Sequence, residues 1–169
     1  MHKNPRTKLA GDRRRLSRKK VFVGGVIVDA NGVNAIDCTI RDINVHGAQV
    51  ESQTKLEIGD QVYLLNTRNE NAHDATITWT KDERTGLSFV RTYSLEVAVP
   101  PQLGFLGRLL VEAKFRQLTT LIERGVHVSE AASVVGLTEE YLERFAGGGD
   151  VDEKFELLLH LAKRLLFKG

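Results

Sequence analysis

The sequence predicts a mainly β protein with an α-helical extension, in which a six-stranded antiparallel β-barrel is followed by a helical region. Three observations lead to this fold class. Short β-branched runs separated by turn residues fill the chain from residue 21 to about residue 90. Pro100 and Pro101 then interrupt the pattern, and apolar residues recur at helical spacing beyond them. Closing six strands on themselves hides the sheet edges, so a barrel is favoured over an open sheet.

We expect the chain to have three parts. A flexible basic arm covers residues 1–20, the β-barrel covers residues 21–95, and a helical extension of three to four helices covers residues 96–169. The last boundary is predicted from VPPQLG (residues 99–104), because two adjacent prolines continue neither a strand nor a helix.

The first two strands carry the clearest β pattern. VFVGGVIVD (residues 21–29) is rich in β-branched residues, and its glycine pair at positions 24 and 25 indicates a bulge or a tight bend. DANG (residues 29–32) predicts the hairpin turn. In AIDCTIRDI (residues 35–43) the apolar residues Ile36, Cys38 and Ile40 alternate with polar ones, which predicts one buried face formed by these three.

The later strands are separated by turns in the same way. A third strand begins near Ala48, and a Gly59-Asp60 turn leads into a fourth. HDATITWT (residues 73–80) predicts the fifth strand, and the polar loop KDERTG leads from it into a sixth, LSFV. The alternation of the fifth strand places three apolar residues on one face: Ala75, Ile77 and Trp79.

Beyond residue 104 the apolar residues predict helices. The first is expected to end near Gly125. Two short helices follow, VSEAASVV with Ser129 as its N-cap and TEEYLERF with Thr138 as its N-cap. A glycine run then precedes a last helix with Asp150 and Glu153 in capping-box spacing. The long apolar faces of the first and last helices favour packing on the barrel, self-association or contact with a partner helix.

Positive charge is concentrated in the arm. Residues 1–20 hold nine Lys or Arg and one Asp, whereas residues 21–95 hold six basic and ten acidic residues. A solvated tail is one explanation. The other is that the arm binds an anion, such as a nucleic acid, a membrane surface or a phosphate ligand.

Enzymatic and metal-binding motifs are not evident in the sequence. The five histidines are scattered without metal-ligand spacing, and neither a P-loop nor a serine nucleophile elbow is present. One cysteine, Cys38, excludes a disulfide framework within the chain. No apolar run reaches signal-peptide or membrane-span length. We therefore expect a cytoplasmic binding protein that is not an enzyme, with no catalytic residue, metal or cofactor.

Four short motifs occur in order between residues 12 and 90. They are Arg14-x-x-x-Arg18, Asp42-x-Asn44-x-x-Gly47, a strand ending in Trp79, and Gly86-x-x-Phe89. This series resembles the PilZ family of cyclic dinucleotide receptors, whose pattern is an RxxxR arm, a (D/N)xSxxG turn, and an apolar strand ending in Trp followed by Gly-x-x-Phe. The resemblance covers about half of the chain, on a six-strand pattern.

The resemblance implies a bacterial receptor that binds cyclic di-GMP and takes part in processes such as motility or biofilm formation. The residues it assigns to the ligand are Arg13, Arg14, Arg18, Asp42, Asn44 and Gly47. Arginine suits a ligand with two phosphates and two guanines, because its planar fork pairs bidentately with either and stacks on bases. The carboxylate of Asp42 can accept from guanine N1 and N2, and Gly47 allows a close backbone approach. Ordering of the arm on binding would then signal to an unidentified protein partner.

Two departures leave alternatives open. Asn44 stands where the family has serine, and Arg15-x-x-x-Lys19 has the same spacing as the arginine pair. A degenerate PilZ-like module that binds a protein but no nucleotide is therefore the second hypothesis. A DNA-binding regulator with a helix-turn-helix-like segment over residues 126–146 is the third, although its second helix is acidic and DNA binding is disfavoured. A homodimer through the C-terminal helices is a further expectation.

Overall fold

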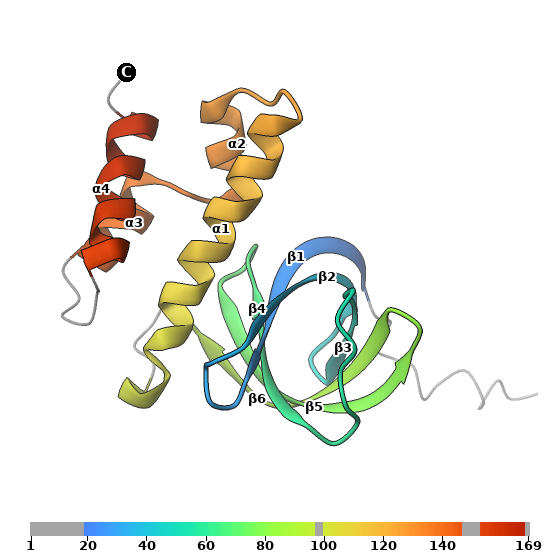
Figure 1. The fold of residues 1–169 in the computed structure, drawn as a ribbon. Coiled ribbons are helices and arrows are strands. Elements are labelled where there is room, and N and C mark those ends of the chain that lie inside the picture. Colours follow the sequence, from blue (N-terminus) through green and yellow to red (C-terminus); the bar gives the residue numbers. More distant parts are fainter. Residues whose placement is uncertain (1–18, 97–99, 147–152, 168–169) are drawn as a thin grey trace, which may run out of the picture.

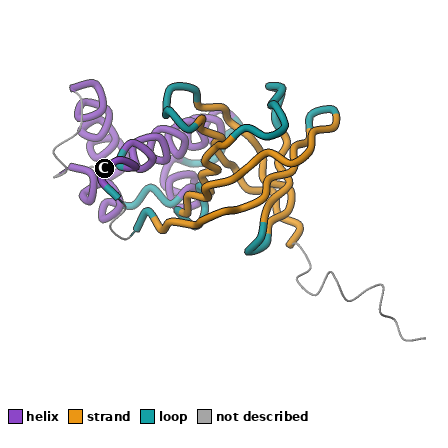
Figure 2. Tube along the Cα trace, turned by 90° about the horizontal axis from the view of Figure 1, so that it is seen from below, coloured by secondary structure: helices purple, strands orange, loops and turns teal. Residues whose placement is uncertain are grey.

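The computed structural model describes residues 19–96, 100–146 and 153–167 (Figure 1). Six strands come first in the chain and helices follow. Figure 2 shows the strands (orange) on one side of the molecule and most of the helical turns (purple) on the other. The strands are β1 (Lys19–Asp29), β2 (Ala35–Ile43), β3 (Gly47–Glu51), β4 (Gln61–Asn66), β5 (Asn71–Lys81) and β6 (Arg84–Ser94). The helical elements are the short 3-10 helix η2 (Pro101–Leu103), α1 (Phe105–Glu123), α2 (Val128–Val135), α3 (Glu139–Ala146) and α4 (Glu153–Phe167).

The strands form a closed antiparallel barrel in the order β1-β2-β3-β6-β5-β4. Closure occurs because β1 pairs with β2 along most of its length and with β4 from Gly25 to Asp29. The predicted fold class, a six-stranded antiparallel barrel followed by helices, is confirmed. The predicted turns at residues 29–32 and at Gly59 are confirmed as well, the first by a hydrogen bond from the amide of Gly32 to the carbonyl of Asp29.

The barrel interior is filled by alternate residues of the strands. Ile40, Leu64 and Ile77 are at most 1% exposed and belong to one cluster with the other inward residues. Cys38 lies in the same cluster, so the predicted alternation of β2 is correct there. Since adjacent strands present alternate residues to the interior, the remaining side chains form an outer face that is free to contact helices or ligands.

β1 is buried on both faces, which explains its unbroken apolar run. Its inward residues Val23 and Ile27 join the barrel core, whereas Val26 and Val28 pack outward against Leu106 and other residues of η2 and α1. Figure 1 shows α1 lying along this side of the barrel, with α3 and α4 beyond it. A strand covered on both sides has no solvent-exposed face, so its sequence does not alternate between apolar and polar residues.

The glycine pair in β1 does not mark a bulge. Gly24 and Gly25 pair regularly with Thr39 and Cys38, and the register of β1 shifts instead between Lys20 and Val23. A Cβ on Gly24 would come against the terminal amide of Gln117 in α1, which is the flexible end of that side chain. The expectation of a bulge at the glycines was therefore wrong.

The helices have their own apolar core, to which α1, α2, α3 and α4 all contribute. Thr138 caps α3 as predicted, because its Oγ1 accepts from the amide of Tyr141 at 3.1 Å. The prediction for α2 was wrong, since His127 rather than Ser129 is the N-cap and its Nδ1 accepts from the amide of Ser129. The helix begins two residues earlier than expected, because an imidazole nitrogen can replace the usual cap oxygen. The predicted capping box at Asp150 lies outside the described residues.

A buried ion pair connects the helices to the barrel. Lys114 of α1 is 1% exposed, and its Nζ lies 3.3 Å from Glu70 Oε1 in the turn between β4 and β5. The same Nζ lies 4.5 Å from the centroid of the Tyr141 ring in α3. One side chain of α1 thus contacts both the barrel and α3, which fixes how these two helices sit on the strands.

Within the described parts of the chain, no helix is long and apolar enough to cross a membrane.

Candidate ligand-binding site

The turn between β2 and β3 is held by Asn44. Its Oδ1 accepts hydrogen bonds from the amides of His46 at 2.8 Å and Gly47 at 3.0 Å. Its own amide donates to the carbonyl of Gly47 at 2.9 Å. This is an Asx-type turn, and a serine hydroxyl can accept from the same amides in the related serine turn. Asn44 therefore has a structural role that serine can also fill.

Gly47 is required by the backbone that packs against it. It opens β3 opposite Ser88 of β6, and a Cβ at this position would collide with the carbonyl oxygen of Leu87. The obstacle is main chain, so no side-chain rotation relieves it. His46 also bonds to β6, because its carbonyl accepts from the amide of Phe89 at 2.8 Å. The turn is consequently fixed to the neighbouring strand at two points.

The basic arm joins the barrel beside this turn. Lys19 lies opposite Ile43 and Lys20 opposite Asp42 at the start of β1. Consecutive Cα atoms are about 3.8 Å apart, so the chain enters β1 next to the residues of the turn. Arg13, Arg14 and Arg18 of the predicted clamp lie outside the described residues.

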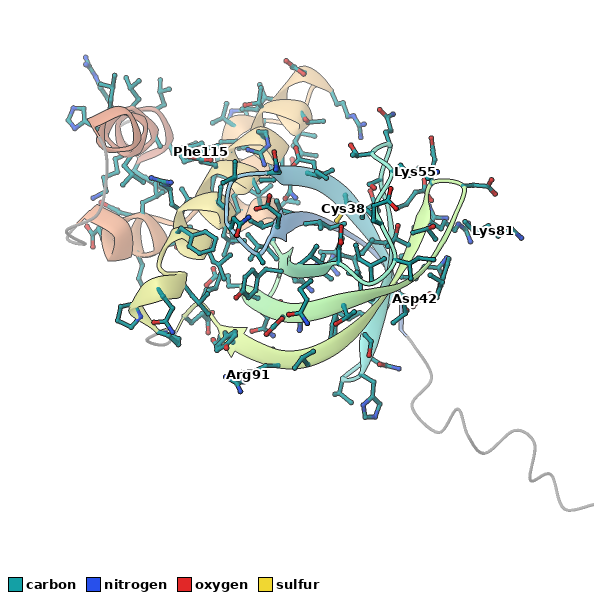
Figure 3. The ribbon with its side chains drawn as sticks, turned by 60° about the horizontal axis from the view of Figure 1, so that its bottom comes forward. Cys38, Asp42, Lys55, Lys81, Arg91 and Phe115 are labelled. Atoms are coloured by element: carbon teal, nitrogen blue, oxygen red, sulfur yellow. The ribbon has the colours of Figure 1, made fainter. Side chains whose placement is uncertain are left out.

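Residues of three sequence motifs lie in one line across neighbouring strands on the outer face of the barrel. Asp42 of β2 lies opposite Gln49 of β3, Gln49 opposite Gly86 of β6, and Gly86 opposite Trp79 of β5. We call Asp42, Gln49, Gly86 and Trp79 the motif row. Neighbouring strands are about 4.8 Å apart, so the row spans roughly 14 Å. Figure 3 shows Asp42 on the side of the barrel away from α1 and its labelled residue Phe115.

Irregular register turns two members of the motif row outward. The pairing of β2 shifts between Ile40 and Asp42, and that of β5 shifts between Ile77 and Trp79. Without these shifts strict alternation would place Asp42 with Ile40, and Trp79 with Ile77, inside the barrel. The prediction that Trp79 shares the inner face of Ile77 was therefore wrong. An extra residue in β5 turns the Trp79 side chain outward and leaves Trp79 37% exposed.

Trp79 lies across Gly86. A Cβ on Gly86 would collide with the indole ring, so only glycine lets the ring lie on the β6 backbone. The exposed indole borders a hollow whose other lining residues come from β3, the β5–β6 turn and β6: Gln49, Glu51, Lys81, Asp82, Glu83 and Arg84. An aromatic ring beside a polar hollow is suited to stacking against a planar base.

Charges near the motif row are partly paired. Arg41 Nη1 lies 3.2 Å from Glu51 Oε2, and Arg84 Nε lies 3.9 Å from the same oxygen. With Lys81, Asp82 and Glu83 of the hollow and Asp42 of the motif row, the patch holds three basic and four acidic side chains. Positive charge for an anionic ligand must therefore come from the basic arm.

The structure describes three of the predicted site residues and groups them. Asp42 lies in the motif row, and Asn44 and Gly47 shape the adjoining turn. Sequence reasoning missed Gln49, since no motif contains it. The pairing of β3 with the motif strand β2 was the signal that could have identified it.

Two side chains with reactive groups, Cys38 and His73, are buried in the part of the chain that is described. No cluster of three or more His, Cys, Asp or Glu residues is arranged there to hold a metal ion. Burial raises the pKa of the Cys38 thiol far above its usual range, which keeps it protonated and unreactive. His73 is also buried, stacked on Phe89 at 4.1 Å, and burial lowers its pKa to about 4.

The comparison with family models agrees with the geometry. The model of the PilZ domain matches residues 12–98, which is 87 of the 169 residues. The chain belongs to the PilZ domain family. The match spans the PilZ arm motif, the turn and the motif row, and it confirms the resemblance found from the four motifs.

A solved PilZ structure is also similar. The crystal structure of the PilZ domain of CeSA from a cellulose-synthesizing bacterium shares 17% sequence identity with a TM-score of 0.38. The match covers 56% of this chain and 95% of that chain. A comparison with curated proteins gives no match.

Proposed function

We propose that this PilZ-domain protein is a receptor for cyclic di-GMP and binds it between the basic arm and the motif row. The observation that carries this proposal is the strand register. It brings the attachment of the arm, Asp42 and the exposed indole of Trp79 to one face of the barrel. The PilZ family, as a family of cyclic di-GMP receptors, supports the identity of the ligand.

Each part of the site matches one part of the ligand chemistry. The arginines of the arm, Arg13, Arg14 and Arg18, supply bidentate donors for the two phosphates. Asp42 accepts from the N1 and N2 donors of a guanine, which distinguishes guanine from adenine. Trp79 offers a surface on which a base stacks, a contact worth about 1–3 kcal/mol in single-stranded nucleic-acid complexes.

The hydrogen bonds of Asn44 bear on the main objection to nucleotide binding. The concern is that a carboxamide longer than serine crowds the ligand. Its Oδ1 instead points into the turn and accepts from two backbone amides. Because the turn keeps its shape with asparagine, we propose that the substitution is compatible with binding.

Binding would also order the arm. The arm carries nine basic residues in its first 20 positions, and their mutual repulsion is relieved when a dianion lies among them. The bound arm then presents a different surface beside β1 and β2, which a protein partner recognises. We place this adaptor in the cytoplasm because its ligand is an intracellular messenger. We further propose the division into an arm to residue 20, a barrel to residue 95 and a helical extension.

Calorimetric titration of the full chain and its variants tests the proposal. The wild type should bind cyclic di-GMP, and Arg14→Ala, Arg18→Ala and Asp42→Ala should each lose about tenfold or more, one strong hydrogen-bonded contact each. Asp60→Ala is the matched control, because this exposed carboxylate lies in the turn before β4 and should leave affinity unchanged.

Two outcomes would change the assignment. Loss in Arg15→Ala but not in Arg14→Ala would move the arginine motif by one residue. No heat with the wild type, at concentrations where GTP and cyclic di-AMP also give none, would leave the protein as an interaction module without a nucleotide.

A further inference from the structure

A crevice of about 450 Å³ lies between the barrel and the first two helices. Its floor is formed by residues of β1 and β2, among them Val23 and Cys38 of the barrel core, and its walls are α1, α2 and the residues that follow β4. The volume falls within the range of about 300–1,000 Å³ that is usual for small-molecule pockets. The motif row and the β2–β3 turn contribute no residue to it. Figure 3 shows Cys38, which lines the crevice, on the side of α1, and Asp42 away from it.

Three arginines line the crevice, one from the turn between β4 and β5, one from α1 and one that caps the C-terminal end of α1. They are Arg68, Arg116 and Arg124, and the acidic residue among the lining side chains is Asp37. Arg116 holds Asp37 bidentately, with Nε and Nη2 at 2.8 and 2.7 Å from the two carboxylate oxygens. Among the described residues, Arg68 and Arg124 have no acidic partner. The crevice therefore carries a surplus of two positive charges.

The rest of the lining is apolar or neutral. Val23, Ala113 and Leu121 contribute apolar surface, and the exposed Val134 lies at the rim. Thr67 and Gln117 bond to each other across the floor at 3.0 Å. A ligand here meets two free guanidinium groups on one part and aliphatic side chains on the other.

We propose that this crevice binds a small organic anion that joins a phosphate or carboxylate head to an apolar body. Arginine suits such a head, because its fork matches two oxygens of a carboxylate or phosphate, as the Arg116–Asp37 pair illustrates within this site. The surplus of two charges favours a dianionic head over a monoanionic one. The apolar body accounts for the valine and leucine surface, which a bare inorganic ion would leave in contact with water.

The position of the crevice gives the ligand a structural effect. Its lining comes from β1, β2, α1 and α2, so a bound molecule contacts the barrel and the helices together. Binding therefore stabilises the arrangement in which α1 and α2 are packed against β1 and β2 as they are in this structure. This inference is independent of cyclic di-GMP binding, since the two sites share no described residue.

Phenyl phosphate is a suitable probe, with an aromatic body and a dianionic head. In an amide NMR titration of the full chain, we expect saturable shifts at Gly24, Gly25 and Thr39, which line the crevice, and none at Gly47 or Gly86. Inorganic phosphate and phenol should each bind at least about tenfold more weakly, because each lacks one half of the ligand. Benzoate distinguishes a carboxylate from a phosphate head.

Variants of the lining arginines test whether binding depends on their positive charge. Arg68→Ala combined with Arg124→Ala should weaken phenyl phosphate binding by about tenfold or more, while Arg91→Ala, an exposed arginine on β6, should not. Unchanged binding in the double variant, shifts centred on Gly47 and Gly86, or no saturation by millimolar phenyl phosphate and benzoate would each overturn the proposal. Cyclic di-GMP supplies an independent readout, because its binding should be retained in the double variant if both proposals hold.

Discussion

Replacing Lys114 with methionine removes the buried charge that joins α1 to the barrel and to α3. The Nζ of Lys114 lies 3.3 Å from Glu70 Oε1 and 4.5 Å from the Tyr141 ring centroid. Methionine retains most of the aliphatic volume of lysine, so the cavity left behind is small. What changes is the charge balance, because the side chain of Glu70 is only 10% exposed and loses this cation.

The expected loss of stability follows from that burial. Removing one partner of a buried ion pair costs about 3–5 kcal/mol, because the remaining buried charge loses the attraction of that partner. Loss of the cation–π contact with Tyr141 adds about 0.5–2 kcal/mol. Together the two contributions predict that the free energy of unfolding falls by about 4–7 kcal/mol, a large share of the roughly 5–15 kcal/mol typical of a folded domain.

Urea unfolding followed by circular dichroism measures this change. Glu70→Gln and the double variant Lys114→Met/Glu70→Gln complete a mutant cycle, in which the double variant should recover about 2 kcal/mol or more relative to the sum of the single changes. Lys55→Met is the control, because Lys55 is exposed in a loop. A loss below about 1 kcal/mol for Lys114→Met, or additive effects in the cycle, would refute the structural role of this pair.

Three further predictions concern the turn, the barrel interior and the indole. Asn44→Ala should lower the free energy of unfolding by about 1–2 kcal/mol in urea titrations, since two hydrogen bonds are lost. Asn44→Ser should cause a smaller loss, because a serine hydroxyl can accept from the same amides. Equal losses in the two variants would contradict the shared role of asparagine and serine in the turn. Burial lowers the pKa of His73 from its usual 6.5 to about 4 in the folded protein. Between pH 6.5 and 4 this histidine is therefore protonated only in the unfolded chain, so the free energy of unfolding should fall by about 3 kcal/mol as the pH drops. His73→Leu should reduce that slope in urea midpoints measured across this range, and an unchanged slope would assign it to other groups. Gly86→Ala should displace the indole of Trp79 and shift the emission maximum of this single tryptophan, while Gly59→Ala, in a turn with no atom near its added Cβ, should not.

Much of the barrel follows from local pattern. Alternation in β2 predicted that Cys38 and Ile40 point inward, and turn residues predicted where strands end. The irregularities were not predictable in this way. The shift between Ile77 and Trp79 depends on how β5 pairs with β6, which the alternation within β5 alone does not reveal, and it reverses the face on which Trp79 lies.

The candidate site likewise contains residues that local motifs identify and residues that only the fold brings together. The motifs identified Asp42, Asn44 and Gly47, because residue type and spacing are visible in the chain itself. Gln49 became evident only through its register with Asp42 and Gly86. The arginine-lined crevice also depends on tertiary structure, since Arg68 and Arg124 are far apart in sequence and only the packing of α1 on β1 brings them to one cavity.

Titration of cyclic di-GMP against the fluorescence of Trp79 is the most direct test of the account. This is the only tryptophan of the chain, and it lies at one end of the motif row. Stacking of a guanine on the indole should give a saturable change in emission, with GTP at the same guanine concentration as the control for absorbance. A saturable change specific to cyclic di-GMP, and reduced in Asp42→Ala, is the predicted result. Identical responses to cyclic di-GMP and GTP would contradict a binding face formed by Asp42 and Trp79.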